Sequence, residues 1–330
     1  MGQHRSAPTG PGQPLTGVTV EAARETGVTA VVVTHNSARH LAALGSALSA
    51  GSLAPTRMLA VDNLSVDDTV DRAREAGFDV LETGANDGFG AGCNAGLRAA
   101  RTEFVLFCNP DVRPSRTALE RLLATLISTS SAAVAGAVLG DDLRPRRFSR
   151  ISTNVAGFLP NRLLDRVRRF KKKAPVEQSE AHVVVDYVVG AFILCRVAPL
   201  RSVEGFDERF FLYCEEEDLS RRLHERGWQT LLVPSAAVSH EQRGSSEGFD
   251  GAAMAPFFTH SLYWYYRKYH SRGYAELARC VIAACVMLDR GYRAIARQPQ
   301  LYGPRAAIAP FRSAESVRRD QKRYASRRMK

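Results

Sequence analysis

The sequence predicts an α/β protein with three layers, in which helices cover both faces of a mostly parallel central sheet. Short β-branched runs alternate with amphipathic segments over the first 140 residues, and this alternation is typical of parallel sheets. Polar residues follow several of these runs at the point where a strand would end. After about residue 250 the chain becomes rich in aromatic and basic residues, which predicts a helical extension beyond the sheet.

The first strand is expected at 28–33, where a β-branched run ends in Thr34-His35-Asn36-Ser37 and leads into a helix that ends near Ala50. The same succession of strand, polar turn and helix recurs along the first half of the chain. Further strands are expected at 58–61, 78–82, 104–108 and 132–139, and further helices at 66–76, 94–100 and 115–125.

The second half of the chain contains shorter strand-like runs. Strands are expected at 183–185, 190–194 and 230–234, and helices from about 215 and over 275–296. No run of about 18 uninterrupted apolar residues occurs, so the sequence predicts no membrane span.

Polar side chains recur at the carboxyl ends of the predicted strands. Asn36 and Asp62 each follow a strand, and Asn109 with Asp111 follows another. In open α/β sheets this edge is where ligands bind. A single polar strand end is ordinary in a loop, but three at the same edge of the sheet are seldom a coincidence. The sequence therefore predicts a ligand site along this edge.

A glycine-rich segment lies at 86–96, between two predicted strands. Gly88, Gly90 and Gly92 would let the backbone approach a ligand closely. The segment is neither a P-loop, because no Gly-Lys-Ser/Thr follows, nor a dinucleotide fingerprint, which should follow the first strand. A simple tight turn is the alternative interpretation.

Four consecutive acids at 215–218 open a predicted helix. Carboxylates are stabilised in a first helical turn by the free backbone N–H groups, so a structural role is one interpretation. The helical period, however, places Glu216 on the same face as Leu212, Leu219 and Leu223. The two acids after it each have an arginine four residues on, whereas Glu216 has none. A half-buried, unpaired carboxylate would have a raised pKa, which suits a general base. Both interpretations stay open.

Asp111 and His240 are candidate metal ligands. Each follows a predicted strand, and a carboxylate with an imidazole suits Mn²⁺ or Mg²⁺ if phosphate oxygens and water complete the coordination. A lone His after a strand is more often structural, and sequence spacing alone does not bring these two residues together.

The net charge of +11 points to nucleic acid, an anionic membrane surface or phosphorylated small molecules as partners. Residues 1–27 have the composition of a disordered leader, and 144–182 form a basic insertion in the domain expected over 28–250. Eleven Lys or Arg and one acid lie within 144–173. This run is interpreted either as a solvated mobile loop or as an amphipathic segment on an anionic bilayer. Residues 251–330 would form the helical extension with a flexible tail.

The six cysteines form no Cys-x-x-Cys pair and lie mostly in apolar runs. They are interpreted as buried free thiols in a reducing cytosol, not as zinc ligands or disulfides.

Taken together, the motifs resemble glycosyltransferase family 2, the inverting nucleotide-sugar transferases of the GT-A fold, and in particular its rhamnosyltransferase-like branch. The resemblance runs from about Val28 to Tyr269. It rests on Val-Val-Val-Thr-His-Asn-Ser at 31–37, Val-Asp-Asn-Leu-Ser at 61–65, Asn-Asp-Gly-Phe-Gly-Ala-Gly-Cys-Asn-Ala-Gly at 86–96, Asn-Pro-Asp at 109–111, Gly-Ala-Phe at 190–192, Gly-Phe-Asp-Glu-Arg-Phe-Phe at 205–211, and His240.

The resemblance implies a role for each matching position. Asp62 would bind the donor's pyrimidine base, and Asp111 with His240 would bind the divalent metal. Glu216 would be the catalytic base, at a position where the family usually has Asp. The other donor-binding residues implied are Thr34, His35, Asn36, Asn63, Asn86, Gly88, Phe89, Gly90, Asn94 and Asn109. The acceptor would lie near Gly190, Ala191, Glu215 and Asp218.

The resemblance also implies the reaction. The expected enzyme is an inverting, Mn²⁺- or Mg²⁺-dependent transferase that moves L-rhamnose from dTDP-rhamnose to a polyprenyl-pyrophosphate-linked or polysaccharide acceptor. It would be cytoplasmic, at the inner face of the plasma membrane, with no nucleic acid partner. One alternative keeps the fold with galactofuranose or a hexose as the sugar and a specialised metabolite as the acceptor. Another, a nucleic-acid-binding α/β protein, leaves the acidic run unexplained.

Overall fold

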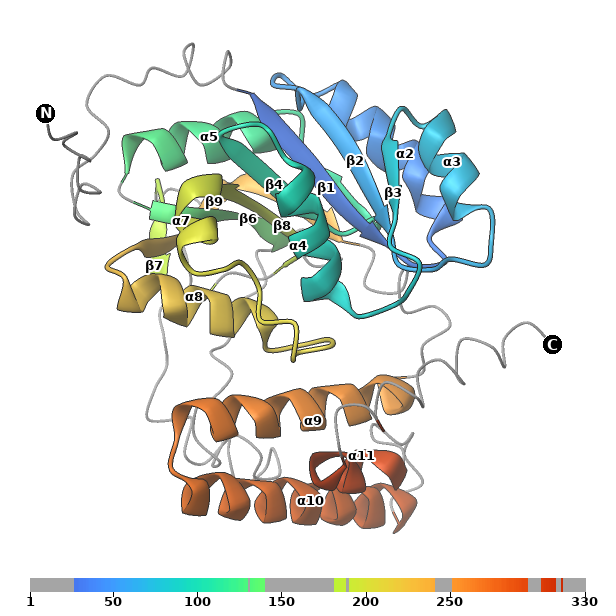
Figure 1. Cartoon of the computed structure of the whole chain (residues 1–330), viewed down its shortest axis with the longest axis vertical. Coiled ribbons are helices and arrows are strands. Elements are labelled where there is room, and N and C mark those ends of the chain that lie inside the picture. Colours follow the sequence, from blue (N-terminus) through green and yellow to red (C-terminus); the bar gives the residue numbers. More distant parts are fainter. Residues whose placement is uncertain are drawn as a thin grey trace, which may run out of the picture.

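A computed structural model of the chain describes residues 27–129, 131–139, 181–187, 190–240, 251–295, 304–312 and 316. Within these residues, nine strands form one mixed sheet with helices on both faces (Figure 1). The predicted three-layer α/β class, with helices added at the C-terminal end, is confirmed. Nearly all of the leader predicted over 1–27, nearly all of the insertion predicted over 144–182 and most of the predicted tail lie outside the described residues.

The first half of the sheet is parallel, as predicted. Strand β1 (Val28–Thr34) pairs in parallel with β2 (Arg57–Asp62) on one side and with β4 (Phe104–Cys108) on the other, and β2 pairs in parallel with β3 (Asp79–Glu82). The register sets Thr34 opposite Asp62. The polar residues that follow these strands therefore reach the same edge of the sheet.

The second half of the sheet is mixed, which differs from the mostly parallel arrangement expected. Strand β8 (Phe192–Arg196) lies between β4 and β6 (Ser131–Leu139) and is antiparallel to both. The sequence could not reveal this direction, because a strand buried on both faces is a continuous apolar run whichever way it points. The remaining strands are β5 (Val112–Pro114), β7 (Val183–Val185) and β9 (Gln229–His240).

Alternate residues of β1 serve two separate cores. Val28, Ala30 and Val32 face the cluster formed with α2 (Ala38–Ser49) and α5 (Ala118–Ser128), while Val31 faces the cluster on the other side. Helix α3 (Thr69–Glu75) also contributes to the first cluster. Helices α4 (Phe89–Ala99), α7 (Val197–Ser202) and α8 (Glu215–Glu225) contribute to the second.

Helix α4 begins at Phe89 and not near residue 94, because the glycine-rich segment is itself helical. A Cβ atom on Gly92 would lie 2.6 Å from Val33 Cγ1, and one on Gly96 would lie 2.3 Å from Val31 Cγ1. Both glycines therefore let the helix pack closely on β1, which outweighs their low helix propensity. At Gly92, one of the three glycines expected to approach a ligand closely, the close approach in the structure is to the sheet.

The C-terminal extension is a helical layer beside the sheet domain (Figure 1). Helix α9 (Gly251–Tyr269) packs on Phe210 and Cys214, the segment that leads into α8, and α10 (Arg272–Ile295) packs on α9. A short helix α11 (Pro304–Ile308) and a 3-10 turn η2 (Ala309–Phe311) follow. None of the described helices combines the length and apolar character needed to cross a membrane.

Four cysteines are buried, as predicted: Cys93, Cys108, Cys195 and Cys214. Burial raises the pKa of the Cys108 thiol to about 12, so this group is an unreactive part of the core. Cys280 on α10 is exposed, contrary to the expectation of burial.

Candidate active site

The Asp62 carboxylate organises the carboxyl ends of β1 and β2. Its Oδ1 accepts hydrogen bonds from Thr34 Oγ1 at 2.9 Å and from Ser65 Oγ at 2.5 Å, and its Oδ2 accepts one from the Ser65 backbone N–H at 2.8 Å. Asp62 is buried. Donors from the end of β1 and from the turn after β2 thus fix one carboxylate at the edge predicted to bind the nucleotide.

The turn after β1 is held against the turn after β2. The Asn36 N–H donates to Ser65 Oγ at 2.8 Å, and Asn36 Oδ1 accepts from the Val66 N–H at 2.9 Å. His35 Nδ1 lies 2.8 Å from the Asn63 carbonyl oxygen. Asn36 has φ 52°, in the left-handed region that non-glycine residues seldom occupy. Backbone strain of this kind concentrates at functional sites, and here it lies on the predicted ligand edge.

Asn63 connects this edge to the start of α4. Its Nδ2 donates to the Gly88 carbonyl at 2.9 Å, and Asn86 Oδ1 accepts from the Gly88 N–H at 3.3 Å. Gly88 has φ 103°, and a Cβ atom there would lie 2.1 Å from the Phe211 carbonyl oxygen. Glycine is therefore required at this position for contact with Phe211, whether or not the turn also binds a donor.

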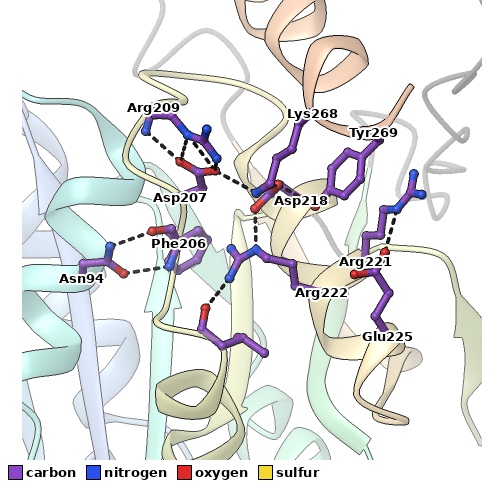
Figure 2. A network of polar contacts seen from close by, with 11 residues as sticks. Asn94, Phe206, Asp207, Arg209, Asp218, Arg221, Arg222, Glu225, Lys268 and Tyr269 are labelled. Carbon is purple, nitrogen blue, oxygen red and sulfur yellow. Dashed lines mark hydrogen bonds and ion pairs between the residues drawn. The ribbon is translucent and has the colours of Figure 1, made fainter. Parts of the chain in front are cut away.

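Asn94 clamps the segment that precedes α8 (Figure 2). Its side-chain amide bonds both backbone polar groups of Phe206, accepting from the N–H at 2.8 Å and donating to the carbonyl at 2.9 Å, and it donates to Glu208 Oε1 at 2.9 Å. Asn94 is buried. The structure gives it an internal structural role, and its predicted contact with the donor stays a prediction.

Asp111 and His240 meet, although 129 residues separate them. Strand β5 pairs with β9 so that Val112 lies opposite His240, and His240 Nε2 lies 3.1 Å from the fully buried Asp111 Oδ1. The pair offers one carboxylate and one imidazole, a donor set that fits Mn²⁺ or Mg²⁺ if phosphate and water oxygens supply the other ligands. In the described part of the chain no third His, Cys, Asp or Glu joins them.

The strand-end residues connect this pair to the acidic helix. Asn109, two residues before Asp111, donates its backbone N–H to the Ala191 carbonyl at 3.0 Å. Gly190, next to Ala191, donates its N–H to Glu216 Oε1 at 2.8 Å. The predicted metal ligands, acceptor residues and base are thus joined through one short series of contacts.

Glu216 lies in the first turn of α8, where the chain makes an unusual bend. Tyr213 and Cys214 both have positive φ, 72° and 67°. Glu216 is half-buried. Burial raises the pKa of its carboxyl group, although the hydrogen bonds from its own backbone N–H and from that of Gly190 act in the opposite direction. A carboxylate that is held by a backbone donor, partly exposed and more basic than usual can accept a proton from a bound hydroxyl.

The helical period that placed Glu216 on an apolar face holds only within α8, where Leu219 and Leu223 follow it by three and seven residues and are buried. Leu212 precedes the helix, and Glu215, Glu217 and Asp218 are all more buried than Glu216. Docking of α9 from one side and of the sheet domain from the other buries a wide sector of α8, which a single period cannot describe. The carboxylate directed toward Gly190 is the most accessible of the four.

Glu215 is buried, and its Oε2 atom has no hydrogen-bond partner in the described structure. Burial raises its pKa well above the ordinary value, and the neighbouring Glu216 charge raises it further. The group is therefore favoured in its protonated form beside the predicted base. A contact with the acceptor remains a prediction for it.

Asp218 is fully buried in a network with residues of α8 and α9 (Figure 2). Arg222 Nε and the Tyr269 hydroxyl each donate to it at 2.7 Å, and Lys268 Nζ forms an ion pair with the same carboxylate. These contacts favour a structural role that fixes α9 against α8. Its predicted acceptor contact is untested.

The network extends to Asp207, which sequence reasoning missed. Lys268 Nζ donates to Asp207 Oδ2 at 2.7 Å, and the Arg209 guanidinium also bonds this carboxylate. Burial alone would raise the pKa of Asp207, but these hydrogen bonds outweigh it and hold the pKa well below the usual range. In the sequence, the only feature that points to Lys268 is its place at the basic end of the aromatic run at 257–269.

Arg221 was expected to form an ion pair with Glu217. In the structure it instead bonds Glu225 at 3.2 Å.

Comparison with known proteins identifies the family of this chain. A family model described as glycosyl transferase family 2 matches residues 29–201, just over half of the chain. An N-acetylglucosaminyl-diphospho-decaprenol L-rhamnosyltransferase of Mycobacterium tuberculosis is 28% identical over 264 residues, which cover 73% of this chain and 84% of that relative. A pre-mycofactocin glycosyltransferase of the same organism is 32% identical over 244 residues, covering 69% of this chain and 47% of that protein.

Among solved structures, the mannosyltransferase PcManGT from Pyrobaculum calidifontis superposes with a TM-score of 0.52 over 89% of this chain and 87% of that chain. At 16% sequence identity this likeness concerns the fold alone. The family match covers β1, α4 and the strand ends that carry the predicted donor residues. The chain therefore belongs to glycosyltransferase family 2 and is a glycosyltransferase similar to the rhamnosyltransferases of that family.

Proposed function

We propose that the enzyme transfers L-rhamnose from dTDP-rhamnose to a hydroxyl of a polyprenyl-diphosphate-linked or polysaccharide acceptor, with inversion at the anomeric carbon and Glu216 as the general base. The observation that carries the proposal is the 2.8 Å hydrogen bond from the Gly190 N–H to Glu216 Oε1. It leaves the other carboxylate oxygen available to a hydroxyl while fixing the orientation of the group.

The residues suit a single displacement. The acceptor hydroxyl attacks the anomeric carbon, the bond to the nucleoside diphosphate breaks, and the hydroxyl proton passes to Glu216. One positioned carboxylate is sufficient for this step. The family usually has Asp at this position, and the extra methylene of Glu216 is accommodated because position 190 has no side chain: a Cβ atom there would lie 2.2 Å from Glu216 Oε1.

Asp111 and His240 would hold a divalent cation, Mn²⁺ or Mg²⁺. When bound, such a cation supplies positive charge that neutralises the departing diphosphate. The fully buried Asp111 carboxylate and its imidazole partner, 3.1 Å apart, support this assignment. The structural relative PcManGT was solved with GDP-Man and Mn²⁺, which supports the same class of cofactor.

The donor and acceptor are proposed from the relatives. The name of the mycobacterial rhamnosyltransferase specifies L-rhamnose as the sugar and a decaprenol diphosphate carrying N-acetylglucosamine as the acceptor. An acceptor on a polyprenyl chain is anchored in a membrane, and we therefore place the enzyme in the cytoplasm at the inner face of the plasma membrane. The hydrogen-bonded Asp62 carboxylate would recognise the pyrimidine base from the edge of β2.

A second candidate is transfer of a different sugar to a specialised metabolite. The pre-mycofactocin glycosyltransferase, at 32% identity, favours this possibility. The two candidates share the base and the fold but differ in donor. Thermal-shift measurements with a panel of nucleotide sugars and Mn²⁺ distinguish them, because only the true donor should stabilise the protein strongly.

Glu216→Gln is the decisive variant. We expect transfer from dTDP-rhamnose to fall by at least about a hundredfold, as is typical for loss of a general base, while calorimetric affinity for dTDP is unchanged. Glu225→Gln, which removes an exposed acid from the other end of the same helix, is the matched control and should retain activity. Turnover by Glu216→Gln at the wild-type rate would rule out the assigned base.

The pH profile gives an independent check. Because burial raises the pKa of Glu216, the acidic limb of the rate profile should have its midpoint above the ordinary value of about 4.3 for Glu. The rate should rise as pH increases through this midpoint, since the base must be deprotonated to accept a proton.

A further inference from the structure

The outward face of α10 is apolar along most of its length. Between Leu277 and Ile295, every exposed residue whose side chain the structure describes is uncharged. These residues are Leu277, Cys280, Ala284, Met287, Leu288, Gly291, Tyr292, Ala294 and Ile295. We refer to them as the α10 stripe. Large contiguous apolar surfaces of this kind mark sites of interaction on soluble proteins.

The stripe follows one side of the helix. Leu277, Ala284, Leu288 and Ile295 recur at spacings of seven, four and seven residues, which correspond to about two, one and two turns. Leu277 is 60% exposed, Leu288 65% and Ile295 86%. From first to last the stripe extends about 27 Å at 1.5 Å per residue.

The opposite side of α10 fixes this orientation. Ala275, Ala278 and Ile282 are fully buried in the cluster with the aromatic residues of α9, and Val286 is buried with α11. Rotating the helix to hide the stripe would expose this packed side. The apolar face is therefore a stable feature of the surface formed by the described residues.

Two further exposed apolar side chains lie on the segment that packs against α10. Ile308 in α11 and Phe311 in η2 are both about half exposed, and both elements contact α10. The Arg279 guanidinium lies 4.6 Å from the centre of the Phe311 ring. A basic group thus lies beside one of these exposed apolar side chains, a combination found in helices at a membrane interface.

The net positive charge of the protein is concentrated in the same part of the sequence as α10. Residues 251–330 contain 16 Lys or Arg and four Asp or Glu, whereas residues 1–250 contain 29 and 30. The entire net charge of +11 therefore comes from the last 80 residues. An apolar face on a segment of net positive charge is complementary to an anionic bilayer, whereas a second copy of this chain would bring together two segments of like charge.

We propose that the α10 stripe docks on an anionic lipid bilayer, with α10 lying in the plane of the interface. The inference extends the proposed function, in which the acceptor is anchored in a membrane. Helix α9 lies between α10 and α8, and Lys268 connects α9 to Asp218 of α8 (Figures 1 and 2). Docking through α10 would hold the helix that carries Glu216 at a fixed distance from the bilayer surface.

Co-sedimentation of the full-length protein with vesicles tests the proposal. Vesicles of phosphatidylcholine with phosphatidylglycerol are compared with phosphatidylcholine alone, without sugar donor or acceptor. The wild type should bind the anionic vesicles, and added salt should weaken the binding. The combined variant Leu277→Gln, Leu288→Gln, Ile295→Gln should bind roughly tenfold or more weakly, because three aliphatic side chains no longer enter the interface.

Val184→Gln is the matched control, since Val184 is 60% exposed but lies on β7 in the sheet domain. It should bind vesicles like the wild type. Thermal unfolding of the combined variant should be unchanged, because the altered side chains are exposed, so weaker binding would not reflect unfolding.

Two outcomes would overturn the proposal. One is equal vesicle binding by the wild type and the combined variant. The other is a wild-type dimer that becomes monomeric in the combined variant with no change in lipid binding, which would identify the stripe as a contact between copies. Because the assay contains no sugar, its failure is distinguishable from failure of the proposed transfer reaction.

Discussion

The two sides of the proposed active site, its donor side and its acceptor side, are built from different kinds of contact. On the donor side, Thr34, Asn36, Asp62 and Asn63 are held by hydrogen bonds between neighbouring strand ends of one parallel unit. On the acceptor side, the helix that carries Glu216 is fixed by an ion pair from Lys268 and a hydrogen bond from Tyr269, both on α9 and about 50 residues further along the chain. The first side is completed by local folding of the sheet, whereas the second requires the C-terminal helices to dock.

Because the two sides are held by different contacts, we expect that binding of the sugar donor and transfer of the sugar can be impaired separately. Changes to the α8–α9 network should affect the base and leave the nucleotide pocket intact. Changes at the strand ends should have the opposite effect.

Lys268→Met should have the largest effect. It removes one ion pair to the fully buried Asp218 and another to Asp207, and loss of one partner of a buried pair costs about 3 kcal/mol of stability. The rate of transfer should fall while dTDP affinity is retained, as measured by urea unfolding, initial rates and calorimetry. Arg267→Met, at the adjacent position, is the control. A parallel loss of dTDP affinity in Lys268→Met would show that the two sides are not separable.

Asn94→Leu should cost about 2 kcal/mol, because both backbone groups of Phe206 lose their buried partner. Asn94 belongs to α4 on the donor side but holds the segment before α8 on the acceptor side. We therefore expect slower transfer with little change in dTDP affinity. If affinity for dTDP falls and the transfer rate at saturating donor does not, Asn94 is a donor ligand, as the family resemblance implies.

Thr34→Val should have a smaller effect, confined to the donor side. The valine cannot donate a hydrogen bond to Asp62 Oδ1. Loss of a hydrogen bond that contributes about 1 kcal/mol corresponds to about fivefold weaker dTDP binding. Thr29→Val, at the other end of the same strand, where the hydroxyl bonds Thr102, is the matched control. Equal affinities for dTDP in these two variants would count against a nucleotide site at this edge.

Glu215→Gln should have the smallest effect, and its size should depend on pH. The pKa of Glu215 is raised in the folded state by burial, so the wild type is most stable below the unfolded-state pKa and loses stability as pH rises toward the folded-state pKa. The neutral variant has no such loss. Urea unfolding at acidic and neutral pH should show that the free energy of unfolding of the variant rises relative to that of the wild type as pH increases. A difference that does not change with pH would contradict the burial of a protonated acid.

The donor side could be predicted from the sequence because its determinants are short-range. Runs such as Val28–Val33 indicate buried strands, parallel strands end at a common edge, and Asn36 and Asp62 follow from that geometry. The register of Thr34 opposite Asp62 agrees with this prediction. Helix boundaries were less predictable: α4 begins five residues before the expected position, because close packing on β1 favours glycines that intrinsic propensity disfavours.

The acceptor side could not be derived in the same way. Asp111 and His240 meet only because β9 is twelve residues long and pairs with β5 at its far end, and neither property is visible in a short apolar run. The partners of Asp218 lie on a helix whose aromatic residues predict packing but not its target. Glu216 was singled out by the family motif and by a helical period of which one member, Leu212, lies outside the helix.

The contact between Gly190 and Glu216 has a consequence for enzyme design. Because a methyl group at position 190 would overlap the carboxylate, Gly190→Ala should displace the base while preserving every ionisable group in the protein. Such an enzyme would have the same charge and the same titratable groups as the wild type. It would provide a way to separate the contribution of carboxylate placement to catalysis from that of carboxylate charge.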